Sequence, residues 1–328
     1  MQAIVLVGGE GTRLRPLTAT VPKPALTIVD RPFLAYMIEW LATHGVTEVV
    51  LACGFLPDIL REALAGEEER AGVRIRYVVE PEPRGTAGAI RFAADELGDD
   101  LDDRFFALNG DVLTDLDLSA LLRTHEECGA RATIGLHPVE DSSAYGLVRL
   151  GTGAGVEEFT EKTGKPVPGQ INAGMYVLQR SVLDMIEPGS NVSIERDVFP
   201  RLTGDGLHGA LLEGYWMDIG TPERYLQASW DILEGEVKTE VEPSGPGLLV
   251  AADAEVAADA AIVAPAVLGP GCRVEGGAEV RASVLLDGCA VGAGARISGS
   301  ILGPGVQVAP GATLDGEVVG ENERVPAP

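Results

Sequence analysis

The sequence predicts two regions joined near residue 235: an α/β domain with a mixed, mostly parallel sheet, followed by a parallel β-helix. Two patterns support this prediction. Before residue 235, short apolar runs alternate with helical patterns, which is typical of βαβ units. From about residue 250, the helical pattern is absent and aliphatic residues recur every six positions. We expect a first domain over 1–235, a linker over 236–249 and the β-helix over 250–328.

The first region contains short apolar segments that are typical of buried strands. Four segments are predicted to be strands: 3–7, 48–52, 73–79 and 104–109. Residues 32–44 and 85–97 carry apolar side chains at helical spacing, with Pro32 suited to the first turn of one helix and Thr86 to the N-cap of the other. Ligands of such sheets bind at the carboxyl ends of the strands.

The aliphatic repeat of the second region keeps its phase over eleven positions, with two one-residue slips: Val256, Ile262, Leu268, Val274, Val280, Leu285, Val291, Ile297, Leu302, Val308 and Leu314. A six-residue repeat indicates a parallel β-helix, in which each aliphatic side chain points into the coil and small residues turn the corners. The alternative is a low-complexity Gly/Ala linker, but such a linker would not hold phase over this distance.

Composition excludes several classes of function. The chain has 328 residues, with 50 Asp and Glu against 25 Lys and Arg, and a formal net charge of −25. This acid excess argues against a basic nucleic-acid-binding face and would repel anionic membranes. The sequence has no apolar stretch long enough to span a bilayer, and its start does not resemble a signal peptide. Four scattered cysteines predict neither zinc nor disulfides, so we expect a cytoplasmic protein.

A glycine-rich segment, GGEGTRLRPLT at residues 8–18, follows the first predicted strand. Three glycines in four positions let backbone N–H groups converge on an anion, and Arg13, Arg15 and Lys23 add positive charge nearby. The segment is neither a P-loop nor a dinucleotide fingerprint, because no GK[ST] follows and Pro16 disfavours immediate entry into a helix. Taken alone, it could also be a surface turn with solvated arginines.

Seven segments in order resemble the sugar-1-phosphate nucleotidyltransferases, or nucleotide-sugar pyrophosphorylases: GGEGTRLRPLT, PKPAL (22–26), EPEPRGTAGA (80–89), LNGDV (108–112), FTEK (159–162), INAGMY (171–176) and WMDIGTPERY (216–225). The resemblance covers essentially the whole chain. It implies a Rossmann-like nucleotidyltransferase domain followed by the left-handed β-helix that many members carry. INAGMY, SIERDVFP (193–200) and WMDIGTPERY are most similar to mannose-1-phosphate guanylyltransferases.

The resemblance implies a reaction in which a sugar-1-phosphate oxygen attacks the α-phosphorus of a nucleoside triphosphate and pyrophosphate leaves. The members that this sequence resembles most use GTP and mannose-1-phosphate as substrates. It implies four catalytic residues: Asp111 and Asp218 hold Mg²⁺, Arg13 steadies the β- and γ-phosphates, and Lys23 contacts the α-phosphate. Asp111 follows a predicted strand at the ligand-binding edge, where a carboxylate suits Mg²⁺, although an Asp after Asn-Gly is also a common turn residue.

Binding residues are also implied by the resemblance. Those for the nucleotide are Leu6, Gly8, Gly9, Gly11, Thr12, Arg13, Lys23, Glu80, Gly85, Thr86, Ala87, Asn109 and Gly110. Those for the sugar phosphate are Gly146, Glu161, Lys162 and Asn172. Thr163 stands where the family often has a proline after the lysine, so Lys165 is the alternative to Lys162.

Glu80 favours guanine as the base. A carboxylate only accepts hydrogen bonds, and guanine presents N1–H and N2–H₂ side by side. Uracil and thymine would bring a carbonyl oxygen against the negative charge, and thymidylyl relatives commonly have Gln at this position. Glu80 could instead point to solvent, and adenine is not excluded by this residue alone.

Three other functions stay open. A glucose-1-phosphate thymidylyl- or uridylyltransferase would have similar motifs. A non-catalytic regulatory paralogue would be marked by loss of Arg13 or a metal aspartate, and all are present. An acyltransferase in the β-helix would resemble enzymes that use a histidine base, but the four histidines lie outside the repeat: His44, His125, His137 and His208. We therefore expect the β-helix to be structural and to form homo-oligomers.

Overall fold

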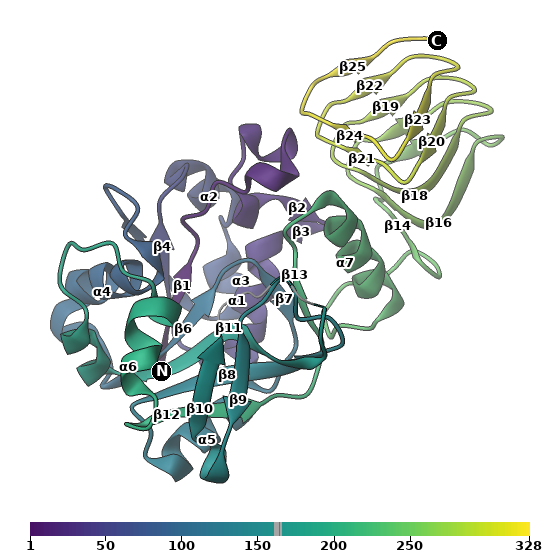
Figure 1. Ribbon diagram of the computed structural model, residues 1–328. Coiled ribbons are helices and arrows are strands. Elements are labelled where there is room, and N and C mark those ends of the chain that lie inside the picture. The colour runs from purple at the N-terminus through teal and green to yellow at the C-terminus, as the bar shows by residue number, and fades with distance from the viewer. Residues whose placement is uncertain (161–163, 165) are drawn as a thin grey trace. The chain divides into compact units, whose positions relative to one another are not determined.

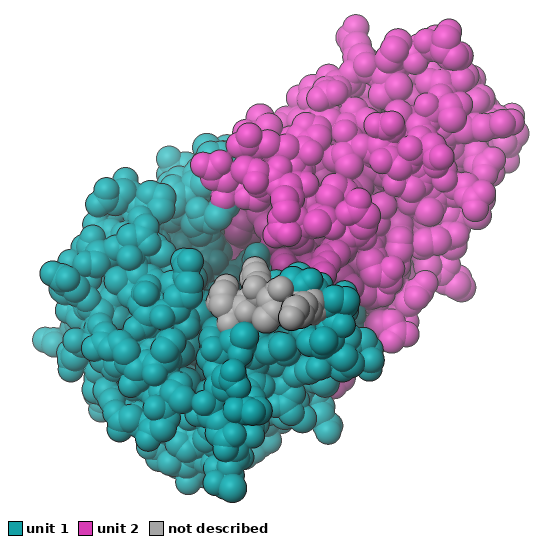
Figure 2. Space-filling view, in the orientation of Figure 1, with its two compact units in different colours: residues 1–9, 37–216 teal, residues 10–36, 217–328 magenta. Residues whose placement is uncertain are grey.

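The computed structural model describes residues 1–160, 164 and 166–328. The chain divides into two compact units, which Figure 2 colours separately. The first unit contains residues 1–9 and 37–216, and the second contains residues 10–36 and 217–328. The second unit therefore combines most of the glycine-rich segment with the C-terminal region.

The first unit is built on a mixed sheet with nine strands among the described residues: β1 (Gln2–Leu6), β4 (Glu48–Cys53), β5 (Arg74–Val79), β6 (Arg104–Asn109), β8 (Ala132–Val139), β9 (Leu147–Leu150), β10 (Val156–Thr160), β11 (Gly169–Gln179) and β12 (Leu207–Leu211). The order is β10-β9-β11-β6-β1-β4-β5, with β8 beside β11 and β12 beside β8. Strands β6, β1, β4 and β5 are parallel, whereas β11 is antiparallel to β6 and β8.

The predicted α/β architecture is confirmed. The four predicted strands correspond to β1, β4, β5 and β6, with ends that differ by no more than one residue. Continuous apolar runs mark these strands because a parallel sheet covered on both faces buries every side chain, as it does along all of β4. The carboxyl ends of β1 and β6 lie side by side, since Leu6 pairs with Asn109.

The helices and the short strands between them complete the fold (Figure 1). The α-helices are α1 (Phe33–Thr43), α2 (Pro57–Ala63), α3 (Glu67–Ala71), α4 (Gly85–Leu97), α5 (Leu118–Cys128), α6 (Phe199–Leu202) and α7 (Pro222–Glu234). Short 3₁₀ or π segments are η1 (Thr12–Leu14), η2 (Leu17–Ala19), η3 (Lys23–Ala25), η4 (Gly98–Asp100), η5 (Thr152–Ala154), η6 (Arg180–Met185) and η7 (Ile194–Val198). Short strands are β2 (Thr27–Ile28), β3 (Arg31–Pro32), β7 (Val112–Thr114) and β13 (Trp216–Asp218). None of the described helices is long and apolar enough to cross a membrane.

Both predicted helices form, and two details differ from expectation. Pro32 ends β3 directly before α1 and does not lie in the helix's first turn. Thr86 is not the N-cap of α4, because the helix begins at Gly85 and its cap position is Arg84. The Thr86 hydroxyl instead points away from α4 and accepts a hydrogen bond from the backbone N–H of Ile194 at 2.8 Å.

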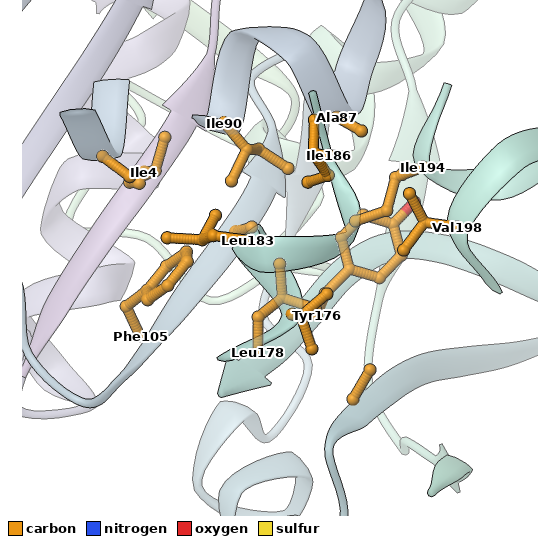
Figure 3. Close-up of a cluster of buried hydrophobic side chains, with 14 of the residues drawn as sticks. Ile4, Ala87, Ile90, Phe105, Tyr176, Leu178, Leu183, Ile186, Ile194 and Val198 are labelled. Carbon is orange, nitrogen blue, oxygen red and sulfur yellow. The ribbon is translucent and has the colours of Figure 1, made fainter. Parts of the chain in front are cut away.

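One apolar core fixes α4 and the segment 182–202 against the sheet. Figure 3 shows Ala87 and Ile90 of α4 in the same cluster as Ile4 of β1 and Phe105 of β6. All four side chains are fully buried. Close packing of this kind makes displacement of α4 or of the segment 182–202 costly in free energy. The loops that adjoin these two elements are therefore held in position.

The C-terminal region of the second unit is a stack of short parallel strands: β14 (Leu248–Val250), β15 (Glu255–Val256), β16 (Ala261–Leu268), β17 (Arg273–Val274), β18 (Glu279–Leu285), β19 (Ala290–Val291), β20 (Arg296–Ser298), β21 (Ile301–Leu302), β22 (Gln307–Val308), β23 (Thr313–Asp315), β24 (Val318–Val319) and β25 (Arg324–Val325). Glu255 pairs with Arg273, 18 positions on, and Arg273 pairs with Ala290, 17 positions on. A coil is therefore three six-residue repeats or one residue fewer, which explains the slips. The parallel strands are consistent with a β-helix.

The repeat's aliphatic residues line the inside of these coils, with one exception. The nine from Leu268 to Leu314 are buried. Val256 was expected to point inward, but it is 38% exposed. It lies in β15, the end strand of its ladder, and therefore has a neighbouring coil on one side of the stack. Helix α7 packs against β16 and β18 of the same stack.

Candidate active site

In the second unit, the glycine-rich segment folds into a tight loop. Gly11 has a left-handed φ of 61°, and a Cβ atom there would lie 3.0 Å from the Cβ of Lys23 and 3.1 Å from the Cγ2 of Thr18. The Thr18 hydroxyl donates to the Gly11 carbonyl at 2.8 Å. Glycine is required here because the loop packs closely on itself. Thr12 and Arg13 remain exposed on its outer side.

Two cationic side chains pair with Asp218, and a third lies close by in space. Lys23 Nζ lies 3.6 Å from Asp218 Oδ1, and Arg224 Nη1 lies 3.6 Å from Oδ2. A Cβ on Gly220 would lie 2.6 Å from Arg13 Nη2, so this guanidinium rests on the backbone just after Asp218. Three positive charges and one negative charge leave two positive, in a chain whose net charge is −25. Such a local excess suits an anionic ligand.

Local sequence explains how Lys23 and Arg224 are placed. Lys23 begins η3 between two prolines, and it is only 8% exposed. Arg224 lies in the first turn of α7, whose N-cap Thr221 accepts a hydrogen bond from the Arg224 backbone N–H. Helical side chains lean toward the helix N-terminus, which directs Arg224 back to Asp218. Sequence reasoning missed Arg224, and its position in the first turn after Thr-Pro was the available signal.

Asp218 has an unsatisfied oxygen. Its Oδ1 atom is buried and, within the part of the chain that the structure describes, accepts no hydrogen bond. A buried carboxylate oxygen that accepts no hydrogen bond is costly even with Lys23 Nζ 3.6 Å away, and a bound cation would lower that cost. The described residues contain no group of three or more His, Cys, Asp or Glu side chains placed to hold a metal. Mg²⁺ does not need one, because it often binds one or two carboxylates together with substrate phosphates.

In the first unit, the LNGD segment places Asp111 at the carboxyl edge of the sheet. β6 ends at Asn109, and the Gly110 backbone N–H donates to the Leu6 carbonyl at 2.9 Å. A Cβ on Gly110 would lie 2.6 Å from Val7 Cγ1, so only glycine fits this turn. The structure thus brings together the predicted residues Leu6, Asn109, Gly110 and Asp111.

Glu80 lies beside the first glycines of the segment. The Glu80 backbone N–H donates to the Cys53 carbonyl, and Glu80 Oε1 is 4.0 Å from the position of a Cβ on Gly8. Gly9 is exposed. Burial raises the pKa of the Glu80 carboxyl, and the neighbouring Arg84 opposes this with a smaller effect. The side chain is thus half-buried beside the glycine backbone.

The predicted nucleotide residues Gly85, Thr86 and Ala87 are anchored to the segment 190–194. Gly85 has a φ of 69°, and a Cβ there would lie 2.6 Å from the Val192 carbonyl oxygen. The Ala87 backbone N–H donates to that same carbonyl at 2.9 Å, and the Ala87 side chain is buried. These residues hold the start of α4 in position, and their contact with a nucleotide stays a prediction.

The predicted sugar-phosphate residues Gly146 and Asn172 are adjacent. The Asn172 backbone N–H donates to the Gly146 carbonyl at 3.1 Å. The Asn172 side-chain oxygen accepts from the Gly174 backbone N–H at 2.9 Å, and its amide nitrogen donates to the Tyr176 hydroxyl at 2.9 Å. Glu161, Lys162 and the alternative Lys165 lie outside the described residues.

Trp216 and two other aromatic residues support this part of β11, and sequence reasoning did not identify them. Trp216 Nε1 donates to the Ala173 carbonyl at 2.9 Å. The indole ring stacks on His137 with centroids 5.8 Å apart and meets Tyr145 edge-on at 5.2 Å. The pairing of β11 with β8 shifts register between Asn172 and Tyr176. Such a bulge re-aims side chains, and here it follows directly on Asn172.

Comparison with known proteins gives matches over most of the chain. The family model described as nucleotidyl transferase matches residues 2–235, and the model described as GMPPB C-terminal domain matches residues 245–326. The mannose-1-phosphate guanyltransferase of Schizosaccharomyces pombe is 41% identical over 276 residues, which cover 83% of this chain and 74% of that protein. The mannose-1-phosphate guanylyltransferase of Mycobacterium tuberculosis is 39% identical over 292 residues, which cover 84% and 79%. The crystal structure of HddC from Yersinia pseudotuberculosis complexed with GMP-PN has a TM-score of 0.61 and 28% identity, and the match covers 70% of this chain and 99% of that one.

Proposed function

The chain belongs to the nucleotidyl transferase family, and we propose that it transfers a guanylyl group from GTP to mannose-1-phosphate, forming GDP-mannose and releasing pyrophosphate. The relatives from Schizosaccharomyces pombe and Mycobacterium tuberculosis are named for this activity. The structural observation that carries the proposal is the cationic cluster around Asp218, with Lys23 and Arg224 each 3.6 Å from its carboxylate.

The reaction needs charge neutralisation more than acid–base chemistry. An oxygen of the sugar phosphate forms a bond to the α-phosphorus, and the bond from that phosphorus to the pyrophosphate oxygen breaks. The attacking oxygen is already anionic, so no covalent nucleophile or general base is required. We assign Arg13 to the leaving β- and γ-phosphates and the buried Lys23 to the α-phosphate. Fixed cations in a partly buried site act strongly on charge that develops in the transition state.

Asp111 and Asp218 are the residues we assign to Mg²⁺. The buried Oδ1 of Asp218, which accepts no hydrogen bond from the described residues, supports this assignment on the second unit. On the first unit, Asp111 follows β6 at the edge where α/β sheets bind ligands. When bound, the ion neutralises phosphate charge and orients phosphate oxygens.

The recognition residues divide into a nucleotide group and a sugar group. For the nucleotide we assign the glycines of residues 8–11 with Thr12, Glu80 as the reader of guanine, and the loops at Gly85–Ala87 and Asn109–Gly110. For mannose-1-phosphate we assign Asn172 and Gly146 with Glu161, and Lys162 for the phosphate. The half-buried position of Glu80 beside Gly8 supports the base assignment, because the carboxylate faces the backbone expected to cradle the nucleotide.

The second region serves structure and assembly in this proposal. We assign residues 1–235 to the catalytic domain, 236–249 to a linker and 250–328 to a left-handed β-helix through which chains form homo-oligomers. The coils of 17 or 18 residues support the β-helix. Four free thiols in the described structure suit a reducing compartment, and we assign the protein to the cytoplasm.

One panel of assays tests the proposal. Pyrophosphate release with Mg²⁺ is measured for GTP, dTTP, UTP and ATP, each with mannose-1-phosphate and with glucose-1-phosphate. We expect GTP with mannose-1-phosphate to give the highest kcat/KM. Preference for dTTP or UTP would refute the guanine assignment, and preference for glucose-1-phosphate would refute the sugar assignment. Light scattering in solution tests the oligomer, which a monomeric mass would exclude.

A further inference from the structure

Glu195 joins the two recognition loops of the first unit by hydrogen bonds. It lies in η7, within the SIERDVFP segment, and it belongs to none of the residues assigned above. Its Oε2 accepts from the Thr86 hydroxyl at 2.9 Å and from the Ser193 hydroxyl at 2.7 Å. Its Oε1 accepts from the Tyr176 hydroxyl at 3.2 Å. One carboxylate thus contacts the start of α4 and the middle of β11.

Each of these hydroxyl groups already accepts a hydrogen bond from elsewhere. The Thr86 oxygen accepts from the Ile194 backbone N–H at 2.8 Å, and the Ser193 oxygen from the Arg196 backbone N–H at 3.3 Å. The Tyr176 oxygen accepts from the Asn172 amide nitrogen at 2.9 Å. Each hydroxyl therefore points its own proton at Glu195. The three hydroxyl protons need a side chain in which both terminal atoms accept hydrogen bonds, and a carboxylate has two such oxygens.

The network fixes the orientation of the Asn172 amide. Its oxygen accepts from the Gly174 backbone N–H, and its nitrogen faces Tyr176. Within the described residues, one N–H and one oxygen lone pair then remain for a ligand hydroxyl. Figure 3 shows the Tyr176 ring beside Ile194 and Val198 in the apolar core, and the ring also meets Phe199 edge-on at 5.1 Å. Because the ring is fully buried, its hydroxyl has a fixed position from which to hold Asn172.

On the nucleotide side, the same carboxylate holds Thr86. The segment that carries Glu195 also provides the Val192 carbonyl, which accepts from the Ala87 backbone N–H, and the close contact with Gly85. Any shift of η7 would therefore move the start of α4. We propose that Glu195 is a positioning residue that sets the sugar-binding amide Asn172 and the nucleotide loop at Thr86 through one shared carboxylate.

This inference rests on the proposed function, and steady-state kinetics of three variants test it. Glu195→Gln keeps the shape but places an amide N–H₂ against hydroxyls that need an acceptor. We expect it to raise both KM values about tenfold, since hydrogen bonds to a charged group are the stronger kind, with kcat lowered less than threefold. Tyr176→Phe should raise only the KM for the sugar phosphate, and Thr86→Val only the KM for the nucleotide.

A double variant separates positioning from general damage. If Glu195 acts on Asn172 through Tyr176, then Glu195→Gln with Tyr176→Phe should have the same sugar KM as Glu195→Gln alone, within about twofold. Multiplied effects would overturn the proposal, as would unchanged KM values in Glu195→Gln. Glu187→Gln is the matched control, because it removes the same charge by the same substitution at an exposed position of the segment 182–202, and its KM values should stay within about twofold of wild type.

The test does not depend on the identity of the substrates. The wild type is assayed first, and the variants are compared on whichever nucleotide and sugar phosphate it prefers, so an unexpected preference refutes only the proposed function. If Glu195→Gln does not fold by circular dichroism, Tyr176→Phe and Thr86→Val carry the test. Each should then change one KM, and the opposite or an equal change in both would overturn the proposal. If the wild type shows no turnover, titration calorimetry with mannose-1-phosphate and GTP replaces KM with Kd.

Discussion

Two carboxylates organise the two units in different ways. Around Asp218 the partners are charged and the ion-pair distances are long, with Lys23 and Arg224 both 3.6 Å from the carboxylate. Around Glu195 the partners are neutral hydroxyls at 2.7 to 3.2 Å. Long contacts between charges leave room for a phosphate or a cation to enter, whereas short hydrogen bonds from neutral donors hold a fixed geometry. We therefore expect the Asp218 cluster to govern turnover and the Glu195 network to govern recognition.

The largest effect should come from removing the charge of Asp218. Asp218→Asn keeps the size of the side chain but leaves Lys23 and Arg224 without their anion, and it weakens the candidate cation site. Removing one preorganised electrostatic group costs about 10²–10³ in kcat, and we expect a loss toward the upper end because two functions are affected. The measurement is pyrophosphate release at saturating substrates.

Asp205→Asn is a matched control for Asp218→Asn. Asp205 forms an exposed ion pair with Arg131 at 2.9 Å and lies outside the predicted motifs. Exposed pairs of this kind contribute about 0–1 kcal/mol, so kcat should not change. If Asp218→Asn retains more than a tenth of wild-type kcat, the cluster does not govern turnover and the comparison fails.

A smaller and more selective effect is expected at Glu80. Glu80→Gln replaces an acceptor of two hydrogen bonds with a group that both donates and accepts, as uracil and thymine require. We expect kcat/KM for GTP to fall about 10- to 100-fold, the range for a lost recognition contact, while the values for dTTP and UTP stay level or rise. An equal loss for every nucleotide would show that Glu80 does not recognise the base.

The fold and the motif residues of the candidate site could be predicted because their signals are local, and the roles of those residues stay predictions. Apolar runs marked the parallel strands, and the six-residue repeat marked the coils, since both depend on residues close in sequence. Glu195 could not be found this way, because its partner Thr86 is 109 positions away. The prediction that Thr86 is a helix cap was wrong for the same reason, because its hydroxyl accepts a hydrogen bond from the distant backbone N–H of Ile194.

The pH dependence of the KM for GTP offers a second test of Glu80. Burial raises the pKa of this carboxyl, so it takes up a proton at a higher pH than an exposed glutamate does. A protonated carboxyl cannot accept from both guanine N–H groups. The KM for GTP should therefore rise as the pH falls through the raised pKa, by about tenfold per pH unit below it.

Acidification should weaken GTP binding but should not weaken the fold through Glu80, so the two effects can be separated. Because the folded-state pKa of Glu80 lies above its unfolded value, protonation stabilises the fold relative to the ionised form. A KM that rises on acidification while the protein stays folded is then a recognition effect. Glu80→Gln should lack this pH dependence, and if the variant keeps it, another group is responsible.

The smallest effect on turnover should come from the β-helix. Leu285 is fully buried and pairs in register with Leu268 and Leu302 of the adjacent coils. Leu285→Ala should cost about 2–5 kcal/mol of stability in a denaturant titration, because it leaves a cavity between coils. Val263→Ala, at a 43% exposed position of the same ladder, should cost about 0.5 kcal/mol or less. Both variants should keep kcat and both KM values at 25 °C, since neither side chain belongs to the Asp218 cluster or the Glu195 network. A tenfold fall in kcat for folded Leu285→Ala would mean that the coils themselves position the catalytic residues, and the two carboxylates would then not be sufficient to account for turnover and recognition.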